Sequence, residues 1–550
     1  MPSVVMLVAA LASGCRAEAP TTSSQSVPAP APAPVVPDLG DHHHPITTSS
    51  AQAQQLFDQG MTLVFGFNHE EAVRRFQAAA AADANAAMPH WGIAWALGPN
   101  YNLDIDDPRA VQASDAMSKA RVLAGGATPA ERDYIELMAG RFSPDPRADR
   151  AALARKYADG ARALMRRYPD DLDAATLYAE SLMNLRPWKL WTLDGKPAPD
   201  TLEIMSVLEG VMRRDPGHIG ANHYYIHTTE ASPSPERGLA SAERLKTLAP
   251  SAGHLVHMPA HVLSRTGDYA GAAAANTAGA EADRAYRAAG GSPGGFYLMA
   301  YFSHNLHFLA DSHMMQGRFA DAQKAADELA ASLMPHVDMM PMIESMVAMQ
   351  LSVPLRFDKF QEVIAAPAPP AGRPVLQAWW HFARGVAYAR AKQPDISVNE
   401  RADLVRVSAT VPESALFGGT GLEPARTVLA VALLVLDARI AEAQAQPAIA
   451  IARWTQAVAA ADRLAYDEPP VWFYPVRESL GGALLRANRA PEAEKAFRDD
   501  LVRHPRNPRA LFGLKEALVR QQKTDDARWV EQAFADAWRN ADSMLTVEGL

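Results

Sequence analysis

Cysteine is almost missing from this chain of 550 residues, because Cys15 is the only one. A single thiol excludes an internal disulfide, a Cys-x-x-Cys-His attachment for covalent haem and a cysteine nucleophile in a folded body. Strand-like runs of alternating Val, Ile and Thr are also nearly absent, and aromatic residues are only 7% of the sequence. Ala and Leu dominate instead, a composition that favours helices.

An excess of positive charge is missing as well. The formal net charge is -9, and acidic and basic residues are interspersed. No basic stripe indicates a nucleic-acid partner, and no polybasic run indicates a membrane surface. The sequence also lacks a glycine-rich phosphate loop and a His-Glu-x-x-His helix. These absences leave open whether the protein is an enzyme.

The N-terminus has the composition of an export signal. Residues 4–12 are apolar and lead into Ala12-Ser13-Gly14-Cys15. This segment resembles a bacterial lipoprotein signal, which implies that Cys15 is lipidated and anchors an exported protein on the periplasmic side of a membrane. The segment before residue 4 holds no Lys or Arg. An ordinary cleaved signal or a misassigned start codon therefore remains as the alternative.

The signal occupies residues 1–15, and a polar, proline-rich stretch follows it. Residues 16–45 are rich in Pro, Ala, Ser and Thr, so we expect an extended tether there. Its end, His42-His43-His44, is either a metal-capturing tract or lid, or plain linker. No later stretch is long and apolar enough to cross a bilayer, so we expect membrane contact only through the lipid anchor.

A period of 34 residues is the strongest signal in the rest of the chain. With Ala53 as position 1, Gly60, Ala72 and Phe76 fall at positions 8, 20 and 24. The same residue types return at the same positions in the unit that begins at Tyr474. Gly and Ala allow the two helices of a hairpin to pack closely, and Phe fills the gap to the next unit.

This pattern resembles the tetratricopeptide repeat over most of the chain from about residue 51. The resemblance implies an all-α fold, a solenoid of stacked helical hairpins. Breaks rich in Pro and Gly at residues 367–373 and 411–423 favour a first array at 46–366, which carries most histidines, and a second array at 367–550. An insertion at residues 187–199, with Trp188 and Trp191, interrupts one unit and is expected near the mouth of a groove.

The 17 histidines are concentrated, because eight of them lie between residues 223 and 313. Within each group they are three or four residues apart, and residues at that spacing share one helix face. Three helices are therefore expected to present a stripe of ligands each. The candidate metal ligands are His223, His227, Glu230, His254, His257, His261, His304 and His307.

The repeat register adds a second constraint on these residues. In the tetratricopeptide family, positions 2, 5, 9, 12 and 13 of the first helix line the concave groove. The candidate ligands fall on such positions in neighbouring units, so the resemblance implies that they point into one groove. Glu180, Asn184 and His313 are candidates for its edge.

Imidazole is a good ligand for Cu, Zn and Fe, and a carboxylate helps to complete the shell. Seven imidazoles exceed one four-coordinate site, which predicts either two metals or one metal with a supporting histidine network. A methionine run at residues 334–349 is either flexible core packing or a set of soft ligands for Cu(I). The alternative function is a groove that binds a peptide, a protein or a small molecule without metal.

Overall fold

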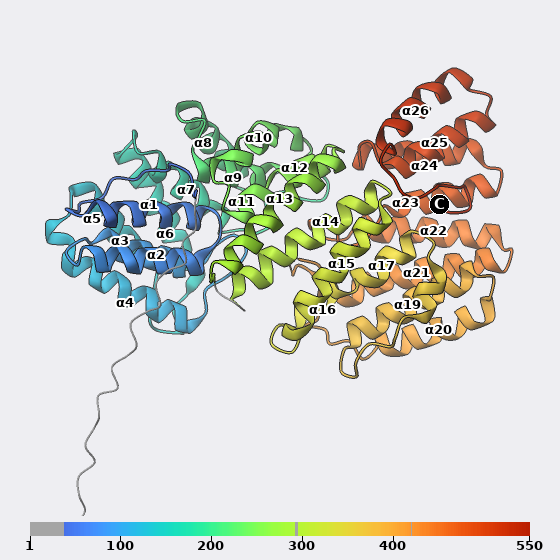
Figure 1. Cartoon of the computed structure of the whole chain (residues 1–550), viewed down its shortest axis with the longest axis horizontal. Helices are drawn as coiled ribbons and strands as arrows, with labels where there is room; N and C mark the ends of the chain where they lie inside the picture. Colours follow the sequence, from blue (N-terminus) through green and yellow to red (C-terminus); the bar gives the residue numbers. More distant parts are fainter. Residues whose placement is uncertain (1–37, 292–294, 420) are drawn as a thin grey trace, which may run out of the picture.

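The computed structural model of the chain describes residues 38–291, 295–419 and 421–550. Figure 1 shows one elongated body of helices that pack in consecutive hairpins, with the N-terminal and C-terminal helices at opposite ends. The described residues contain almost no strand, so the predicted all-α solenoid of stacked hairpins is confirmed. The signal with Cys15, and the tether up to residue 37, lie outside the described residues.

Helices follow one another with short connections throughout the chain. Those before residue 367 are α1 (Ala51–Phe65), α2 (His69–Ala82), α3 (Met88–Leu97), α4 (Asp107–Leu123), α5 (Pro129–Ala139), α6 (Arg150–Arg167), α7 (Leu172–Met183), α8 (Thr201–Arg214), α9 (Ile219–Thr229), α10 (Leu239–Leu248), α11 (Gly253–His257), α12 (Pro259–Arg265), α13 (Tyr269–Ala288), α14 (Ser303–Met315), α15 (Phe319–Leu333), α16 (Glu344–Val347), α17 (Met349–Arg356) and α18 (Phe360–Ala365). Those after it are α19 (Pro374–Arg390), α20 (Pro394–Ser408), α21 (Ala425–Ala443), α22 (Pro447–Ala461), α23 (Val476–Arg486), α24 (Ala490–Arg503), α25 (Pro508–Arg520) and α26 (Thr524–Ala537). The strands β1 (Leu416–Phe417) and β2 (Glu423–Pro424) form one short antiparallel pair.

The repeat spacing works through close contact between glycine and phenylalanine. A Cβ atom added at Gly60 would lie 2.5 Å from the ring of Phe76, and one at Gly92 would lie 2.6 Å from the same ring. Gly60 and Phe76 belong to one hairpin, and Gly92 belongs to the next. The fully buried Phe76 ring therefore joins two units, as the spacing predicts.

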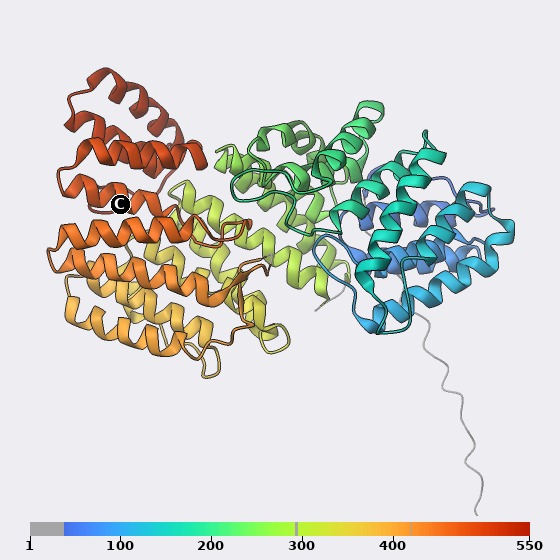
Figure 2. The same ribbon diagram turned by 180° about the vertical axis from the view of Figure 1, so that it is seen from behind.

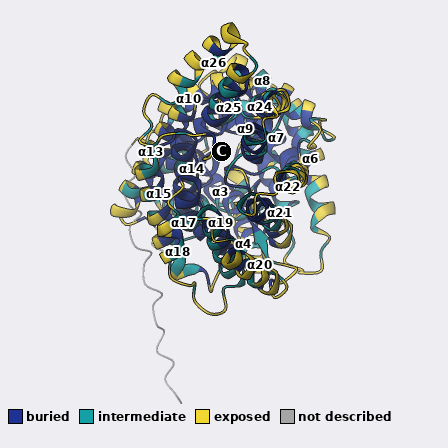
Figure 3. Ribbon diagram, turned by 90° about the vertical axis from the view of Figure 1, so that its right-hand side faces the viewer, coloured by how far each residue is buried: buried dark blue, intermediate teal, exposed yellow. Residues whose placement is uncertain are grey.

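The burial of residues follows the stacking of the helical hairpins. Figure 3 shows the buried residues gathered along the inside of the body and the exposed ones on its outer faces. Seen from behind in Figure 2, loops of the second array turn toward the light-green helices of the middle of the chain. Among the described residues, no helix combines the length and the apolar character that a bilayer span requires.

The last part of the expected tether is packed on the body rather than extended. In residues 38–45, which we call the N-terminal strap, Leu39 and His44 are buried. The Nδ1 atom of His44 lies 2.7 Å from Oδ2 of Asp173, which also lies close to His42 and His218. The tether boundary at residue 45 is thus too late, because a buried carboxylate on α7 holds these histidines.

Candidate metal centre

The candidate ligands come from four helices in the middle of the chain. They are His223 and His227 on α9, Glu230 directly after it, His254 and His257 on α11, His261 on α12, and His304 and His307 on α14. The start of α9 is fixed by His218, whose side chain accepts a hydrogen bond from the backbone of Ala221. All of the candidate ligands are buried except His304, which is half-buried.

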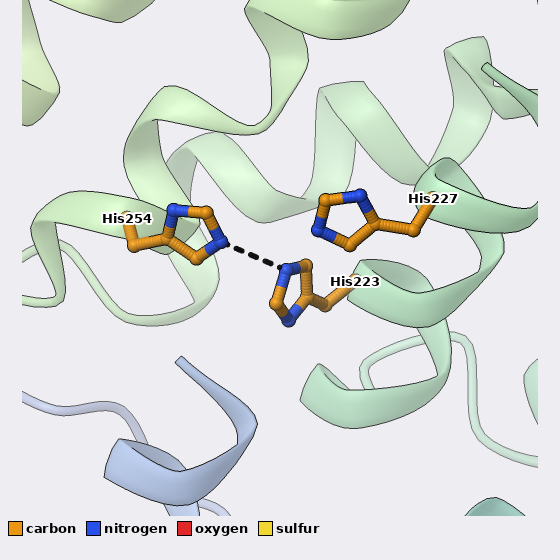
Figure 4. Close-up of side chains that lie close together, drawn as sticks. All are labelled: His223, His227 and His254. Atoms are coloured by element: carbon orange, nitrogen blue, oxygen red, sulfur yellow. Dashed lines mark hydrogen bonds between the residues drawn. The ribbon is translucent and has the colours of Figure 1, made fainter. Parts of the chain in front are cut away.

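The first group consists of His223, His227 and His254. One nitrogen from each ring lies within 4.8 Å of the others, and Figure 4 shows the three rings facing one another from α9 and α11. The Nε2 atoms of His223 and His254 are 3.1 Å apart. The Nε2 atom of His227 is buried and has no hydrogen-bond partner among the described residues.

The second group consists of His257, His261 and His304, which also offer ligand atoms within 4.8 Å of one another. The Nε2 atoms of His257 and His261 are 2.8 Å apart, and those of His304 and His261 are 3.4 Å apart. Three helices thus supply three imidazoles to one point.

The two groups adjoin and share a carboxylate. The ring centroids of His227 and His261 are 5.5 Å apart, and those of His254 and His257 are 5.6 Å apart. Glu230 lies between the groups, with Oε1 2.9 Å from Nδ1 of His227 and Oε2 2.6 Å from Nδ1 of His261. The groups are therefore parts of one centre.

Oxygen acceptors orient four of the six imidazoles. Besides the two contacts of Glu230, Nδ1 of His223 faces the carbonyl of Phe65, and Nδ1 of His257 lies 2.6 Å from Oδ1 of Asn276. A carbonyl or carboxylate oxygen only accepts, and burial lowers the pKa of His223, His227 and His257. The Nδ1 atoms of these three rings therefore carry the proton, and their Nε2 atoms keep a free lone pair. This is the tautomer in which histidine binds a metal through Nε2.

The contact between His257 and His261 brings two Nε2 atoms together in the second group. The amide of Asn276 has one orientation that fits its surroundings, because its Nδ2 donates to the carbonyl of Ala272. Its Oδ1 therefore faces His257, and Nε2 of His257 keeps a lone pair 2.8 Å from Nε2 of His261. This lone pair accepts either a proton from His261 or a metal ion.

The electrostatics favour neutral imidazoles in this centre. Burial, reinforced by the neighbouring histidines, lowers the pKa of His223, His254, His257 and His304 well below its ordinary value. Burial alone would raise the pKa of Glu230, but the attraction of His261 and His227 outweighs it and lowers that pKa to about 2. The centre therefore combines four rings that burial keeps neutral with the carboxylate charge of Glu230.

Four of the predicted site residues lie outside both histidine groups: His307, His313, Glu180 and Asn184. His307 is buried beside Trp379 and Ser345 in a separate small cavity, because three residues advance a helix by about 4.5 Å and only His304 reaches the second group. His313 lies farther along α14. The predicted convergence of all seven imidazoles thus does not include His307.

The two residues expected at the edge from α7 have other partners. Glu180 accepts hydrogen bonds from Trp95 and from Asn184, and it lies 3.9 Å from Arg141. Neither Glu180 nor Asn184 contacts the histidine groups. They belong to a neighbouring polar cluster.

Glu468 joins the centre although the sequence analysis missed it. It lies between α22 and α23, is 3% exposed, and places Oε2 3.4 Å from Nδ1 of His261. Burial, together with the charge of Glu230, raises its pKa well above the ordinary value. No local pattern marks Glu468, because only the folding of the second array against the first brings it near His261.

A cavity of about 160 Å³ opens on both groups. Its lining includes His227, His254, His261 and His304, together with Glu468. Trp188 of the predicted insertion also lines it, as expected for a residue at the mouth. In the glycine-rich loop nearby, residues 292–294 lie outside the described part of the chain.

No protein-family profile matches the chain, and no curated protein matches it. Among solved structures, the human IFIT1 dimer with m7Gppp-AAAA is 12% identical, over 90% of this chain and 91% of that chain, with a TM-score of 0.33. The Cut9–Hcn1 assembly of APC/C is 10% identical over 90% and 80%, with a TM-score of 0.34. Yeast Tom70 is 10% identical over 88% and 92%, with a TM-score of 0.30. The described residues of the present chain form a scaffold of repeated helical hairpins.

Proposed function

We propose that this protein binds two transition-metal ions, one in each three-histidine group. The observation that carries the proposal is the convergence of three imidazoles in each group, with ligand nitrogens within 4.8 Å of one another. In the second group, a metal ion would use the Nε2 lone pair of His257, which lies 2.8 Å from Nε2 of His261. The buried and unpartnered Nε2 of His227 supports a second ion in the other group.

The ligand set fits Cu, Zn or Fe. Each group offers three imidazoles and no carboxylate, and imidazole nitrogen is a common ligand of all three metals. A metal with three protein ligands keeps an open position, where it can polarise or activate a bound molecule. This arrangement supports a metal-dependent enzyme, and it also serves a protein that stores or transfers the metal.

The remaining residues of the centre have supporting roles. Glu230 holds the Nδ1 protons of His227 and His261, which keeps both Nε2 atoms pointed at the centre. Burial of both groups keeps water away from the ligands. Glu468 adds a second carboxyl group beside His261, so the complete centre requires both arrays.

We also propose that the protein is exported and held at the periplasmic side of a membrane through a lipid on Cys15. The support is the sequence around Cys15, followed by the proline-rich tether. A centre displayed outside the cytoplasm would take its metal from that compartment. Membrane attachment and metal binding are independent, so each has its own test.

Elemental analysis of the untagged full chain tests the metal proposal. We expect about two transition-metal ions per chain after incubation with Cu, Zn or Fe, and about one in the double variant His257→Ala/His261→Ala. The matched control, His336→Ala/His504→Ala, removes two partly exposed histidines outside the centre and should keep both ions. A folded parent chain that stays metal-free would refute the proposal and favour a groove that binds a peptide or protein.

A further inference from the structure

The cavity beside the metal centre is lined by apolar side chains as well as by histidines. Met299, Met340, Met342 and Met346 line it, and three of these belong to the methionine run of the sequence. Aromatic rings, among them that of Trp188, line the cavity together with these methionines, and we call this apolar lining the methionine wall. The methionines therefore contribute to a ligand cavity as well as to the core. Thioether side chains adapt to the shape of a ligand and make favourable contacts with aromatic rings.

The charges around the cavity disfavour an acidic ligand. No Arg or Lys is among the described residues that line it, whereas Asp467 and Glu468 are. An anionic group placed against the apolar wall would be desolvated without a counter-charge. The lining combines many apolar side chains with four histidines, so a suitable ligand is neutral and has an apolar body with one polar group.

The size of the cavity limits the size of the apolar part of the ligand. An apolar cavity of about 150 Å³ holds one benzene molecule. The present cavity, at about 160 Å³, therefore has room for a single ring. A ring with edges against the methionines and Trp188 would fill it, whereas a small polar molecule would leave the wall exposed to water.

We propose that this cavity binds a neutral molecule with a single aromatic ring. This inference rests on the proposed function, since it names the class of molecule that the fold presents to the metals. The ring occupies the methionine wall, and its polar substituent points to the histidine groups. Binding of this molecule is measured on the metal-free chain, separately from metal binding.

Gly419 offers a way to fill the cavity without disturbing the ligands. An added Cβ atom there would have Asp467 Oδ1 at 3.5 Å and His304 Nδ1 at 3.9 Å as its near neighbours, which are ordinary contact distances. Gly419→Leu therefore places its side chain in the cavity that Gly419 lines. The matched control is Gly125→Leu, because Gly125 is exposed and an added Cβ meets nothing within 4 Å.

The test is a fluorine NMR titration of the metal-free full chain with 4-fluorophenol and 4-fluorobenzoate. We expect saturable binding of 4-fluorophenol, at least tenfold weaker binding of 4-fluorobenzoate, and at least tenfold weaker 4-fluorophenol binding in Gly419→Leu but not in Gly125→Leu. Absence of saturable binding, equal binding of the anion, or an unchanged Gly419→Leu variant would each overturn the inference. Metal content, measured on the same preparations, reports separately on the proposed metal centre.

Discussion

Asn276→Leu tests the central argument, because it removes the acceptor that fixes the tautomer of His257. Asn276 is fully buried, and its Oδ1 lies 2.6 Å from Nδ1 of His257. Leucine has a similar size but accepts no hydrogen bond. Without the acceptor, His257 is free to move its proton to Nε2 and donate it to Nε2 of His261, 2.8 Å away. The lone pair needed for a metal is then lost.

The expected change in metal affinity is larger than the expected change in the stability of the metal-free protein. Loss of a group that orients a metal ligand typically weakens metal binding by about 10-fold to 100-fold. This corresponds to about 1.4–2.7 kcal/mol. The metal-free protein should lose little stability, because the new hydrogen bond between the two histidines returns about 0.5–1.5 kcal/mol. The variant thus separates metal affinity from folding.

Metal titration and urea unfolding of the metal-free chain measure the two effects. Asn276→Asp keeps an acceptor for His257 and should retain most of the affinity. Asn507→Leu is the matched control, because Asn507 is equally buried and donates to Glu478 and Asp500. It should lower stability by about 1–3 kcal/mol without changing metal affinity. Metal binding by Asn276→Leu that equals the parent's would refute the tautomer argument.

Three further outcomes are expected. The N-terminal strap should be docked most firmly between about pH 4 and 6.5. Burial lowers the pKa of His42 and His44, but the attraction of Asp173, helped by Asp58, outweighs burial and raises both pKa values. The stabilisation of the docked strap by these two histidines is therefore complete below about pH 6.5, and it is lost as the pH rises through the raised pKa values. The pKa of Asp173 is lowered well below its ordinary value, because its three histidine contacts outweigh burial, so its contribution is lost only in strong acid. The protection factors of the amides of residues 38–45, which correct for the faster intrinsic exchange at high pH, should therefore be lower at pH 8.5 than at pH 5.5. Asp173→Asn should remove this difference in protection. Phe497→Ala should lower the free energy of unfolding by about 3–5 kcal/mol in urea, since this fully buried ring packs against Gly481 and Gly513 of successive units. Cys15→Ala should move the protein from the membrane fraction to the soluble fraction of its host, and equal membrane association of the variant would exclude Cys15 as the anchor.

The fold could be read from the sequence because its signals are local and repeated. Gly60 and Phe76 are within one unit, and their spacing alone predicts a close helix contact that the structure contains. The same holds for the histidine stripes, since a helix sets the relation between residues three or four apart. The repeat register then brings α9, α11, α12 and α14 side by side, so six of the seven imidazoles meet.

Only the tertiary structure decided how these residues divide and what completes them. The separation into two groups follows the break between α11 and α12 at Met258, and His307 lies outside both groups because it is further along α14 than His304. Glu468 reaches His261 from a loop more than 200 residues later in the chain, and His44 reaches Asp173 from the strap. Such contacts join segments whose sequences carry no mutual pattern, because packing between distant units, rather than helix geometry, fixes their distance.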